Sequence, residues 1–254
     1  MNHFSKSFSI FIAVVLAFSF FSCSSDDSPA ATGTESSFTD KYSSETSGYV
    51  TWYEGAAAAV AYYVPEIESG WYHCAVSEPK YADLPAGTAI ELSANGKTVH
   101  LLVTDLCPSS ENAQHTSKAT YFFDLEKSAF TSLADASVGE LQMTFKTIPY
   151  PTAKNIKMQV KDGVNEWWLA FRFYNMRYPL KKVEFSADGT NFTEVAKLSG
   201  IENNWYKTES STGGLLSGAH YFRLTDVHDQ QVTTANLGAF TANGTVDTQK
   251  NFAP

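Results

Sequence analysis

Hydrophobic and polar positions alternate over short stretches in the first half of this chain, a pattern typical of β-strands. Residues 88–92 alternate, an Asn95-Gly96 pair follows, and residues 98–103 form a second apolar run. An Asn-Gly pair between two such runs predicts a hairpin turn. Residues 48–53 and 141–146 give two further strands. These runs predict an all-β first half that closes near residue 147, with one or two helical turns.

The second half continues in short strands after a proline-rich break. Pro149-Tyr150-Pro151 interrupts any strand ladder and predicts a tight hinge between two domains. Turn pairs such as Asp162-Gly163 and Gly213-Gly214 then separate short apolar runs, and strands at this spacing predict a β-sandwich. The runs cover residues 156–160, 167–174, 180–185, 193–197, 205–206 and 220–224. Residues 125–133 predict one short helix, and residues 241–254 a polar, loose tail.

The N-terminal segment has the features of an export signal. Lys6 precedes an apolar run over residues 10–21, which is too short to span a bilayer and is typical of a signal peptide. Ser22-Cys23 then resembles the processing site of bacterial lipoproteins, so residues 1–22 would be removed and Cys23 would carry lipid; an ordinary signal peptide is the alternative. Residues 23–47 are polar and acidic and predict a flexible spacer.

The spacer and the cysteines extend this export prediction. The spacer begins with Ser24-Ser25-Asp26-Asp27, which resembles the surface-export tag of Bacteroidetes-type lipoproteins and predicts an outer-membrane protein at the cell surface. An oxidising compartment favours a disulfide between Cys74 and Cys107, with a free buried pair as the alternative. The cysteines lack a matching histidine spacing, so no metal site is predicted.

Charge excludes some ligands. The net charge is −9, and residues 48–149 hold 5 Lys or Arg against 12 Asp or Glu, whereas residues 150–240 hold 10 against 9. The sequence offers no basic face for nucleic acid. The acidic first half also argues against a highly anionic polymer as the main ligand.

Two aspartates end strand-like runs in matching settings. Asp105 follows residues 101–104 and Asp124 follows residues 121–123. A strand holds a carboxylate at its end rigidly, and paired carboxylates are typical of sites that act on polysaccharides. Each has a structural alternative, because Asp124 would also suit a helix N-cap and Asp105 a turn.

Adjacent tryptophans, Trp167 and Trp168, are a candidate sugar-binding platform. Neighbouring residues of a strand face opposite sides, so one of the two would ordinarily be buried. A turn over residues 162–166 directly precedes them, and a strand end allows both rings to be exposed. Exposed indoles stack on the apolar faces of pyranose rings. Phe171, Phe173 and Phe185 are predicted to be core.

The ordered motifs over residues 48–238 resemble the expansin family, especially the bacterial expansin-like proteins. The motifs are GYVT at 48–51, VTDLCP at 103–108, FDL at 123–125 with SAF at 128–130, EWWLA at 166–170, NMRYPL at 175–180 and FRLTD at 222–226. The resemblance implies a six-stranded double-psi β-barrel over residues 48–148. It implies an immunoglobulin-like β-sandwich that binds carbohydrate over residues 149–240.

The resemblance also implies roles for individual residues. Thr51, Asp105 and Asp124 match the groove of the barrel, and Asp124 matches the position on which expansin activity depends most. Cys107 replaces a tyrosine that bacterial relatives often carry, which supports the disulfide to Cys74. Trp167 and Trp168 match the aromatic platform; its third member is Trp205, with Tyr206 as the alternative.

The implied activity is the loosening of cell-wall polysaccharide without hydrolysis. The expected partners are cellulose, xyloglucan or other β-glucan-rich wall polymers, with peptidoglycan as a further candidate, and the membrane through the lipid on Cys23. We expect a monomer without cofactor or metal. Two alternatives stay open: a polysaccharide-cleaving enzyme on the same barrel, either an endoglucanase or a lytic transglycosylase, and a surface tether that only binds carbohydrate.

Overall fold

The structure is a computed structural model that describes residues 44–54, 66–110, 113, 121–199 and 204–253. The predicted signal peptide, Cys23 and most of the predicted spacer lie outside the described residues. Within the described residues, no helix is long and apolar enough to cross a membrane. The last two residues of the predicted spacer already belong to the first strand.

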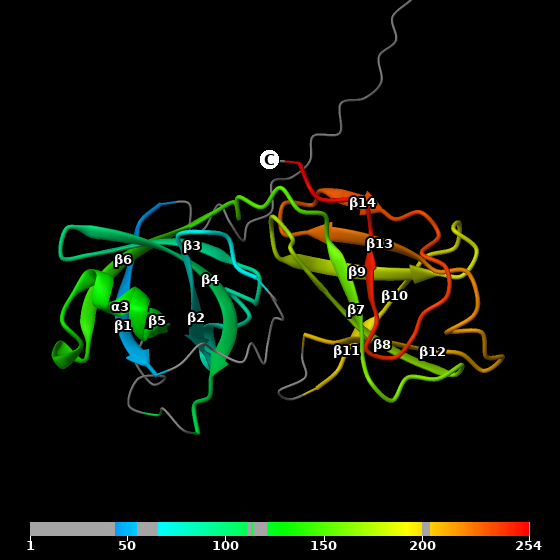
Figure 1. Cartoon of the computed structure of the whole chain (residues 1–254), viewed down its shortest axis with the longest axis horizontal. Coiled ribbons are helices and arrows are strands. Elements are labelled where there is room, and N and C mark those ends of the chain that lie inside the picture. The colour runs from blue at the N-terminus through cyan, green and yellow to red at the C-terminus, as the bar shows by residue number, and fades with distance from the viewer. Residues whose placement is uncertain (1–43, 55–65, 111–112, 114–120, 200–203, 254) are drawn as a thin grey trace, which may run out of the picture. The chain divides into compact units, whose positions relative to one another are not determined.

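The first half of the chain forms a closed six-stranded barrel (Figure 1). Its strands are β1 (Thr46–Tyr53), β2 (Trp71–Ser77), β3 (Ala89–Ala94), β4 (Lys97–Cys107), β5 (Tyr121–Glu126) and β6 (Leu141–Ile148). They are ordered β1-β5-β2-β4-β3-β6 around the barrel. The pairs β1/β5 and β2/β4 are parallel and the others are antiparallel. The predicted six-stranded barrel is confirmed.

Alternation along the strands builds the barrel core. Val50, Leu101 and Phe123 are fully buried and face the interior with alternate residues of their own strands. Asn95 and Gly96 have positive φ angles of 52° and 72°, which the hairpin turn between β3 and β4 requires, as predicted.

Short helices lie in the connections between barrel strands. The 3₁₀ helices η1 and η2 cover Glu78–Lys80 and Ala136–Val138, and the α-helix α3 covers Lys127–Leu133. Ala129, Phe130 and Leu133 of α3 are buried in the barrel core. The helix predicted over residues 125–133 therefore exists, but its first two residues end β5 instead.

The second half contains two sheets. One has the order β10-β9-β13-β14 and the other β11-β12-β8-β7-β15. The strands are β7 (Lys157–Val160), β8 (Trp168–Tyr174), β9 (Leu180–Ser186), β10 (Thr193–Glu194), β11 (Ala196–Lys197), β12 (Tyr206–Glu209), β13 (Tyr221–Asp226), β14 (Gln231–Thr233) and β15 (Thr245–Asp247). Phe171 and Phe173 from one sheet meet Phe222 from the other in a shared core, as expected of a sandwich. Phe185 packs at the edge of this core.

The C-terminal segment is part of this sandwich, contrary to the prediction of a loose tail. Residues Thr245–Asp247 form β15 and pair with β7, and Phe252 is buried. Asn251 donates hydrogen bonds from its side-chain amide to the carbonyl oxygens of Lys154 and Asn175, at 2.7 and 2.9 Å. The polar composition misled the prediction because these polar groups bond to backbone rather than to water.

Cys74 and Cys107 do not form the predicted disulfide; both are buried thiols. Cys74 is paired with Val103 across the β2/β4 ladder, whereas Cys107 is paired with Ser77, three residues further along β2. This places the two α-carbons roughly 10 Å apart at about 3.3 Å per residue, beyond the span of a disulfide. Cys74 Sγ lies 3.6 Å from the Leu102 carbonyl oxygen, which accepts its hydrogen bond.

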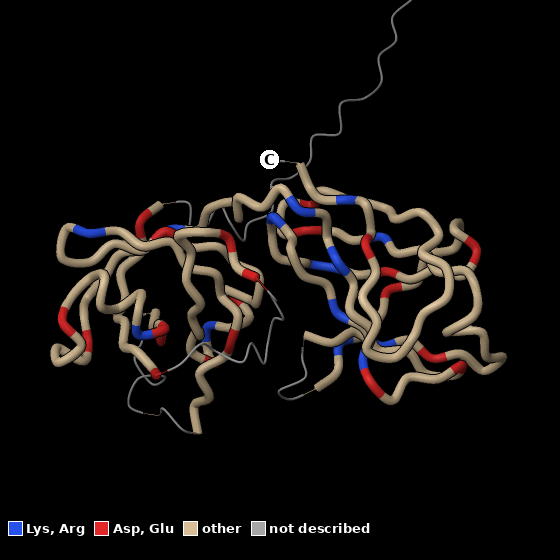
Figure 2. The backbone as a smooth tube through the Cα atoms, viewed as in Figure 1, with Lys and Arg blue, Asp and Glu red and all other residues tan. Residues whose placement is uncertain are grey.

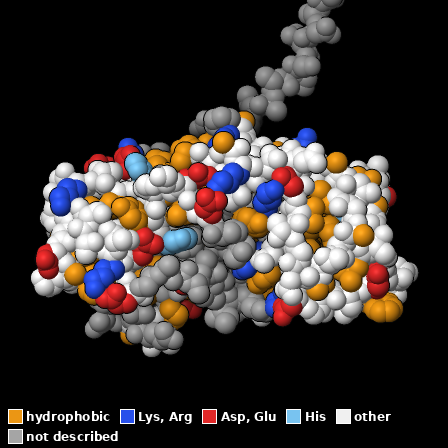
Figure 3. Space-filling view, viewed as in Figure 1, with side chains coloured by type: hydrophobic (Ala, Val, Ile, Leu, Met, Phe, Trp, Pro, Cys, Tyr) orange, Lys and Arg blue, Asp and Glu red, His pale blue; other side chains and the backbone are white. Residues whose placement is uncertain are grey.

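Charge is distributed unevenly over the strands. Figure 2 shows Lys and Arg at many positions along the sandwich strands, whereas the barrel is the acidic half of the chain. On the face drawn in Figure 3, acidic and basic side chains are interspersed. No group of three or more His, Cys, Asp or Glu residues within the described ranges is arranged to hold a metal ion.

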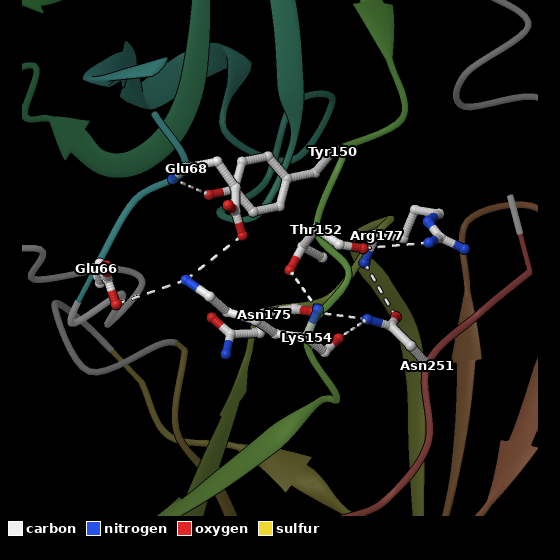
Figure 4. A network of polar contacts seen from close by, with 8 residues as sticks. All are labelled: Glu66, Glu68, Tyr150, Thr152, Lys154, Asn175, Arg177 and Asn251. Atoms are coloured by element: carbon white, nitrogen blue, oxygen red, sulfur yellow. Dashed lines mark hydrogen bonds and ion pairs between the residues drawn. The ribbon is translucent and has the colours of Figure 1, made fainter. Parts of the chain in front are cut away.

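The segment between β6 and β7 is anchored at Tyr150 (Figure 4). The Tyr150 side chain is buried, its ring lies edge-on to Trp71, and its hydroxyl accepts a hydrogen bond from the Glu68 backbone N–H at 2.9 Å. The Tyr150 backbone N–H donates a hydrogen bond to the Arg177 carbonyl oxygen at 3.0 Å. Lys154 Nζ forms ion pairs with Glu68 at 3.5 Å and with Glu66 at 3.7 Å. The proline-flanked segment predicted as a hinge is thus held by contacts at its central residue.

Candidate functional site

Asp105 and Asp124 lie on two strands that flank β2. Ala75 of β2 is paired with Asp105 of β4 on one side and with Asp124 of β5 on the other. Two strand spacings of about 4.8 Å put the two aspartate backbones roughly 10 Å apart. The two aspartates singled out in the sequence thus lie on nearby strands, one on each side of β2.

A β-bulge decides which way Asp105 faces. Cys74 is paired with Val103, but the next residue of β2, Ala75, is paired with Asp105, so Thr104 is the extra residue in β4. Without this shift Asp105 would alternate in phase with Val103, which faces the barrel core. With it, Asp105 shares the outer face of the barrel wall with Ala75 and Cys107. Bulges often re-aim a side chain in this way beside functional sites.

Thr51 and Asp124 form a hydrogen-bonded pair on the same outer face. They are directly paired in the parallel β1/β5 ladder, and Thr51 Oγ1 donates to Asp124 Oδ1 at 2.6 Å. Asp124 is not the N-cap of α3, because that position is held by Glu126. The strand interior, rather than a helix start, fixes the Asp124 carboxylate.

Asp105 also lies within a strand, not in a turn. Its carboxyl is half-buried, and this desolvation raises its pKa above the usual value near 3.8. A hydrogen bond from the Leu106 backbone N–H to Asp105 Oδ1, at 2.8 Å, acts in the opposite direction and lowers the pKa. Desolvation is the larger effect, so Asp105 holds its proton to higher pH than an exposed aspartate.

Two tyrosines border these aspartates, and the sequence analysis missed both. Burial raises the pKa of Tyr53, and four nearby acidic groups, of which Asp105 and Asp124 contribute least, raise it further. Burial, with a smaller contribution from Asp105, raises the pKa of Tyr81 to about 12. Both hydroxyls therefore stay protonated at neutral pH, and the Tyr53 hydroxyl is buried without a hydrogen-bond partner among the described residues. Tyr53 lies two residues after Thr51 on β1 and therefore faces the same side of the strand. This spacing could have indicated from the sequence that Tyr53 lies near the site.

Trp167 and Trp168 sit where a turn meets β8. Trp167 precedes the strand and is 61% exposed, while Trp168 is its first residue and is half-buried. The Asn165 side-chain oxygen accepts hydrogen bonds from both backbone N–H groups, at 2.9 and 3.0 Å. This turn, predicted from residues 162–166, lets both rings reach the surface despite their adjacency.

Trp205, and not Tyr206, reaches the outer face of the same sheet. Tyr206 is paired with Phe171 and buried against it, so its ring is core, and the alternative of Tyr206 as the third platform residue is wrong. Trp205 is half-buried, and the Arg172 guanidinium lies 4.3 Å from its ring centre. Arg172 and Trp168 alternate onto the outer face of β8, roughly 13 Å apart along the strand.

Comparison with known proteins agrees with this architecture. The chain is 27% identical over 148 residues to Expansin-YoaJ of Bacillus subtilis, covering 58% of this chain and 56% of the relative. It is 33% identical over 105 residues to Expansin-like protein 1 of Dictyostelium discoideum, covering 41% of this chain and 35% of the relative. The chain thus spans about a third to somewhat over half of the length of these curated relatives. No family model matches it.

The fold is also similar to solved structures. A crystal structure of an aspartate-to-asparagine mutant of Clavibacter michiganensis expansin in complex with cellohexaose superposes with a TM-score of 0.67 at 21% identity, covering 83% of this chain and 99% of that one. The apo form of that expansin gives the same values.

The closed six-stranded barrel and the two-sheet sandwich of this chain therefore have a fold similar to that of this expansin. The sequence similarity covers expansins from a bacterium and from an amoeba. The chain is therefore similar to expansins in sequence over part of its length and in fold over most of it.

Proposed function

We propose that this protein binds cellulose or another β-glucan-rich wall polysaccharide and loosens it without cleaving it. The observation that carries the proposal is the outer barrel face on which the Thr51–Asp124 pair and Asp105 flank one strand. The similarity to expansins, one of them solved with cellohexaose, supports the same substrate class.

The sandwich and the barrel would have different roles in this function. Trp167, Trp168 and Trp205 would adsorb to polysaccharide by stacking indole faces on pyranose rings. On the barrel, Thr51, Asp105 and Asp124 would hydrogen-bond to sugar hydroxyls. These bonds would replace those between neighbouring glucan chains, so the chains could slide without any covalent bond breaking.

The hydrogen bond to Asp124 supports a non-hydrolytic action. Inverting hydrolysis needs one carboxylic acid that donates a proton and one carboxylate that activates water. By the resemblance to expansins, Asp124 matches the catalytic acid of related endoglucanases, and here it accepts a hydrogen bond from the Thr51 hydroxyl. Loosening without cleavage needs neither proton transfer, only hydrogen bonds of the kind that Asp124 already forms with Thr51.

The setting of the protein is part of the proposal. The apolar run over residues 10–21, followed by Ser22-Cys23 and an acidic spacer, supports export and lipid attachment at Cys23. The protein would then be held on the outer membrane, facing outward, as a monomer. Xyloglucan and peptidoglycan are further candidate polymers.

Adsorption to microcrystalline cellulose tests the platform. Trp167→Ala in the full chain should lower the bound fraction at least several-fold, because the exposed ring is the anchor, and should leave stability within about 0.5 kcal/mol. Phe192→Ala is the matched control, since this ring packs beside Arg223, on the other sheet, and should leave adsorption unchanged. Equal adsorption of Trp167→Ala and wild type would reject the platform.

A further inference from the structure

A pocket of about 490 Å³ lies on the barrel beside the candidate site. It spans the outer face of β1, β6 and β3 and ends at the hairpin turn between β3 and β4. Its lining consists of Ser47, Gly48, Tyr49, Ser93, Ala94, Asn95, Gly96, Gln142, Met143 and Thr144. A volume of this size is in the range of small-molecule sites.

The pocket lies next to the Thr51–Asp124 pair along β1. Ser47, Tyr49 and Thr51 alternate onto the outer face, with about 6.6 Å between successive members of this row. Tyr49 is paired with Phe122 of β5 on one side and with Gln142 of β6 on the other. Tyr49 therefore forms the wall that separates the pocket from the aspartate face, one step along the strand from Thr51.

The lining has the chemistry of a site for a neutral sugar. It offers hydroxyl groups from serine and threonine, side-chain amides from Gln142 and Asn95, and one aromatic ring from Tyr49. None of its residues is Asp, Glu, Lys or Arg. Hydroxyls and amides act as both donors and acceptors, which matches sugar hydroxyls, whereas an anionic sugar would need a cation that this lining does not supply.

We propose that this pocket binds a neutral glucose unit of the same polysaccharide chain that crosses Thr51 and Asp124. This inference rests on the proposed function, because it extends the path of the glucan over the barrel by one further subsite. Gln142 would donate from its amide to a sugar hydroxyl, and the Tyr49 ring would cover one face of the pyranose.

The test is a titration of the full, ¹⁵N-labelled chain with cellohexaose, followed by two-dimensional amide spectra. The Gln142 side-chain amide is identified by its absence in Gln142→Ala. We expect this amide and the Gly48 and Gly96 backbone amides to shift along one saturable curve. Gln142→Ala should weaken the cellohexaose affinity, measured from the shift of the Gly96 amide, about three- to tenfold. This is the contribution expected of one hydrogen bond.

Two controls accompany the titration. Gln231→Ala removes the same side chain from an exposed position in β14 and should leave the affinity at Gly96 unchanged. An anionic galacturonate hexamer should not shift the pocket amides.

The outcomes separate the two proposals. Shifts of the Trp167 indole signal with unmoved pocket amides would overturn the pocket and leave the proposed function standing. A spectrum unmoved in both regions would overturn both. Pocket shifts that Gln142→Ala leaves equally strong would also overturn the assignment.

Discussion

Asp105 faces outward because of a single irregularity in β4. The extra residue, Thr104, shifts the strand phase between Val103 and Asp105, and Thr104 itself is fully buried beside His73, with Oγ1 and Nδ1 3.2 Å apart. This places Asp105 on the outer face that Thr51 and Asp124 share. At the scale of residues, the site is a set of polar groups on one face of the barrel. Strict alternation along β4 would instead have turned Asp105 toward the core.

The raised pKa of Asp105 predicts a pH dependence of stability. A folded-state pKa above the unfolded value means that the native state binds this proton more tightly. The contribution is therefore present at pH values below the usual pKa near 3.8 and is lost as the pH rises through the raised value. Asp105→Asn keeps the acceptor for the Leu106 N–H but cannot ionise. Chemical unfolding from pH 3 to 7 should show wild type losing stability relative to the variant as pH rises.

Asp188 provides a control of opposite sign for that experiment. Hydrogen bonds from Asn191 and Thr190 hold the pKa of the Asp188 carboxyl below its usual range. Wild type should therefore gain stability relative to Asp188→Asn as the pH rises. A difference between wild type and Asp105→Asn that stays constant with pH would contradict the desolvation of Asp105.

At the scale of elements, the pairing of β1 with β5 carries the site. Gly48 lies where the two strands approach, and a β-carbon there would clash with the Tyr121 carbonyl oxygen and with the Met143 methyl group. Glycine thus permits the close parallel pairing that aligns Thr51 with Asp124.

Gly48→Ala should consequently destabilise the barrel by about 1–3 kcal/mol, as overpacking commonly does. Urea unfolding of the full chain measures this loss. Ser47→Ala, one residue away on the outer face, should change stability by less than about 0.5 kcal/mol. Equal midpoints for Gly48→Ala and wild type would show that β1 and β5 are not packed as described.

The sequence predicted the elements better than their irregularities. Alternation and the Asn95-Gly96 turn marked β3, β4 and β6, because local chemistry determines them. The β4 bulge was missed, since strict alternation gives no sign of an extra residue. The disulfide failed for a related reason, because the spacing of cysteines does not reveal strand register. The strand β15 was missed because it is short and polar.

At the scale of the whole molecule, the barrel and the sandwich belong to one compact unit. Tyr150 joins them from the connecting segment through its contacts with Glu68, Trp71 and Arg177. Anchoring of this segment would couple adsorption through the tryptophans to the action of the barrel. In the proposed function, the sandwich holds the polymer while the barrel face competes for the hydrogen bonds between its chains.

The most direct test of this account is the extension of heat-inactivated plant wall strips under constant load, with the bathing solution assayed for soluble sugars. Wild type should extend the strips without releasing oligosaccharides. Asp124→Asn, which keeps the acceptor for Thr51 but removes the charge, should bind the wall equally and extend it at least several-fold less. Undiminished extension by Asp124→Asn, or oligosaccharides that appear with wild type and vanish with the variant, would contradict non-hydrolytic loosening through this face.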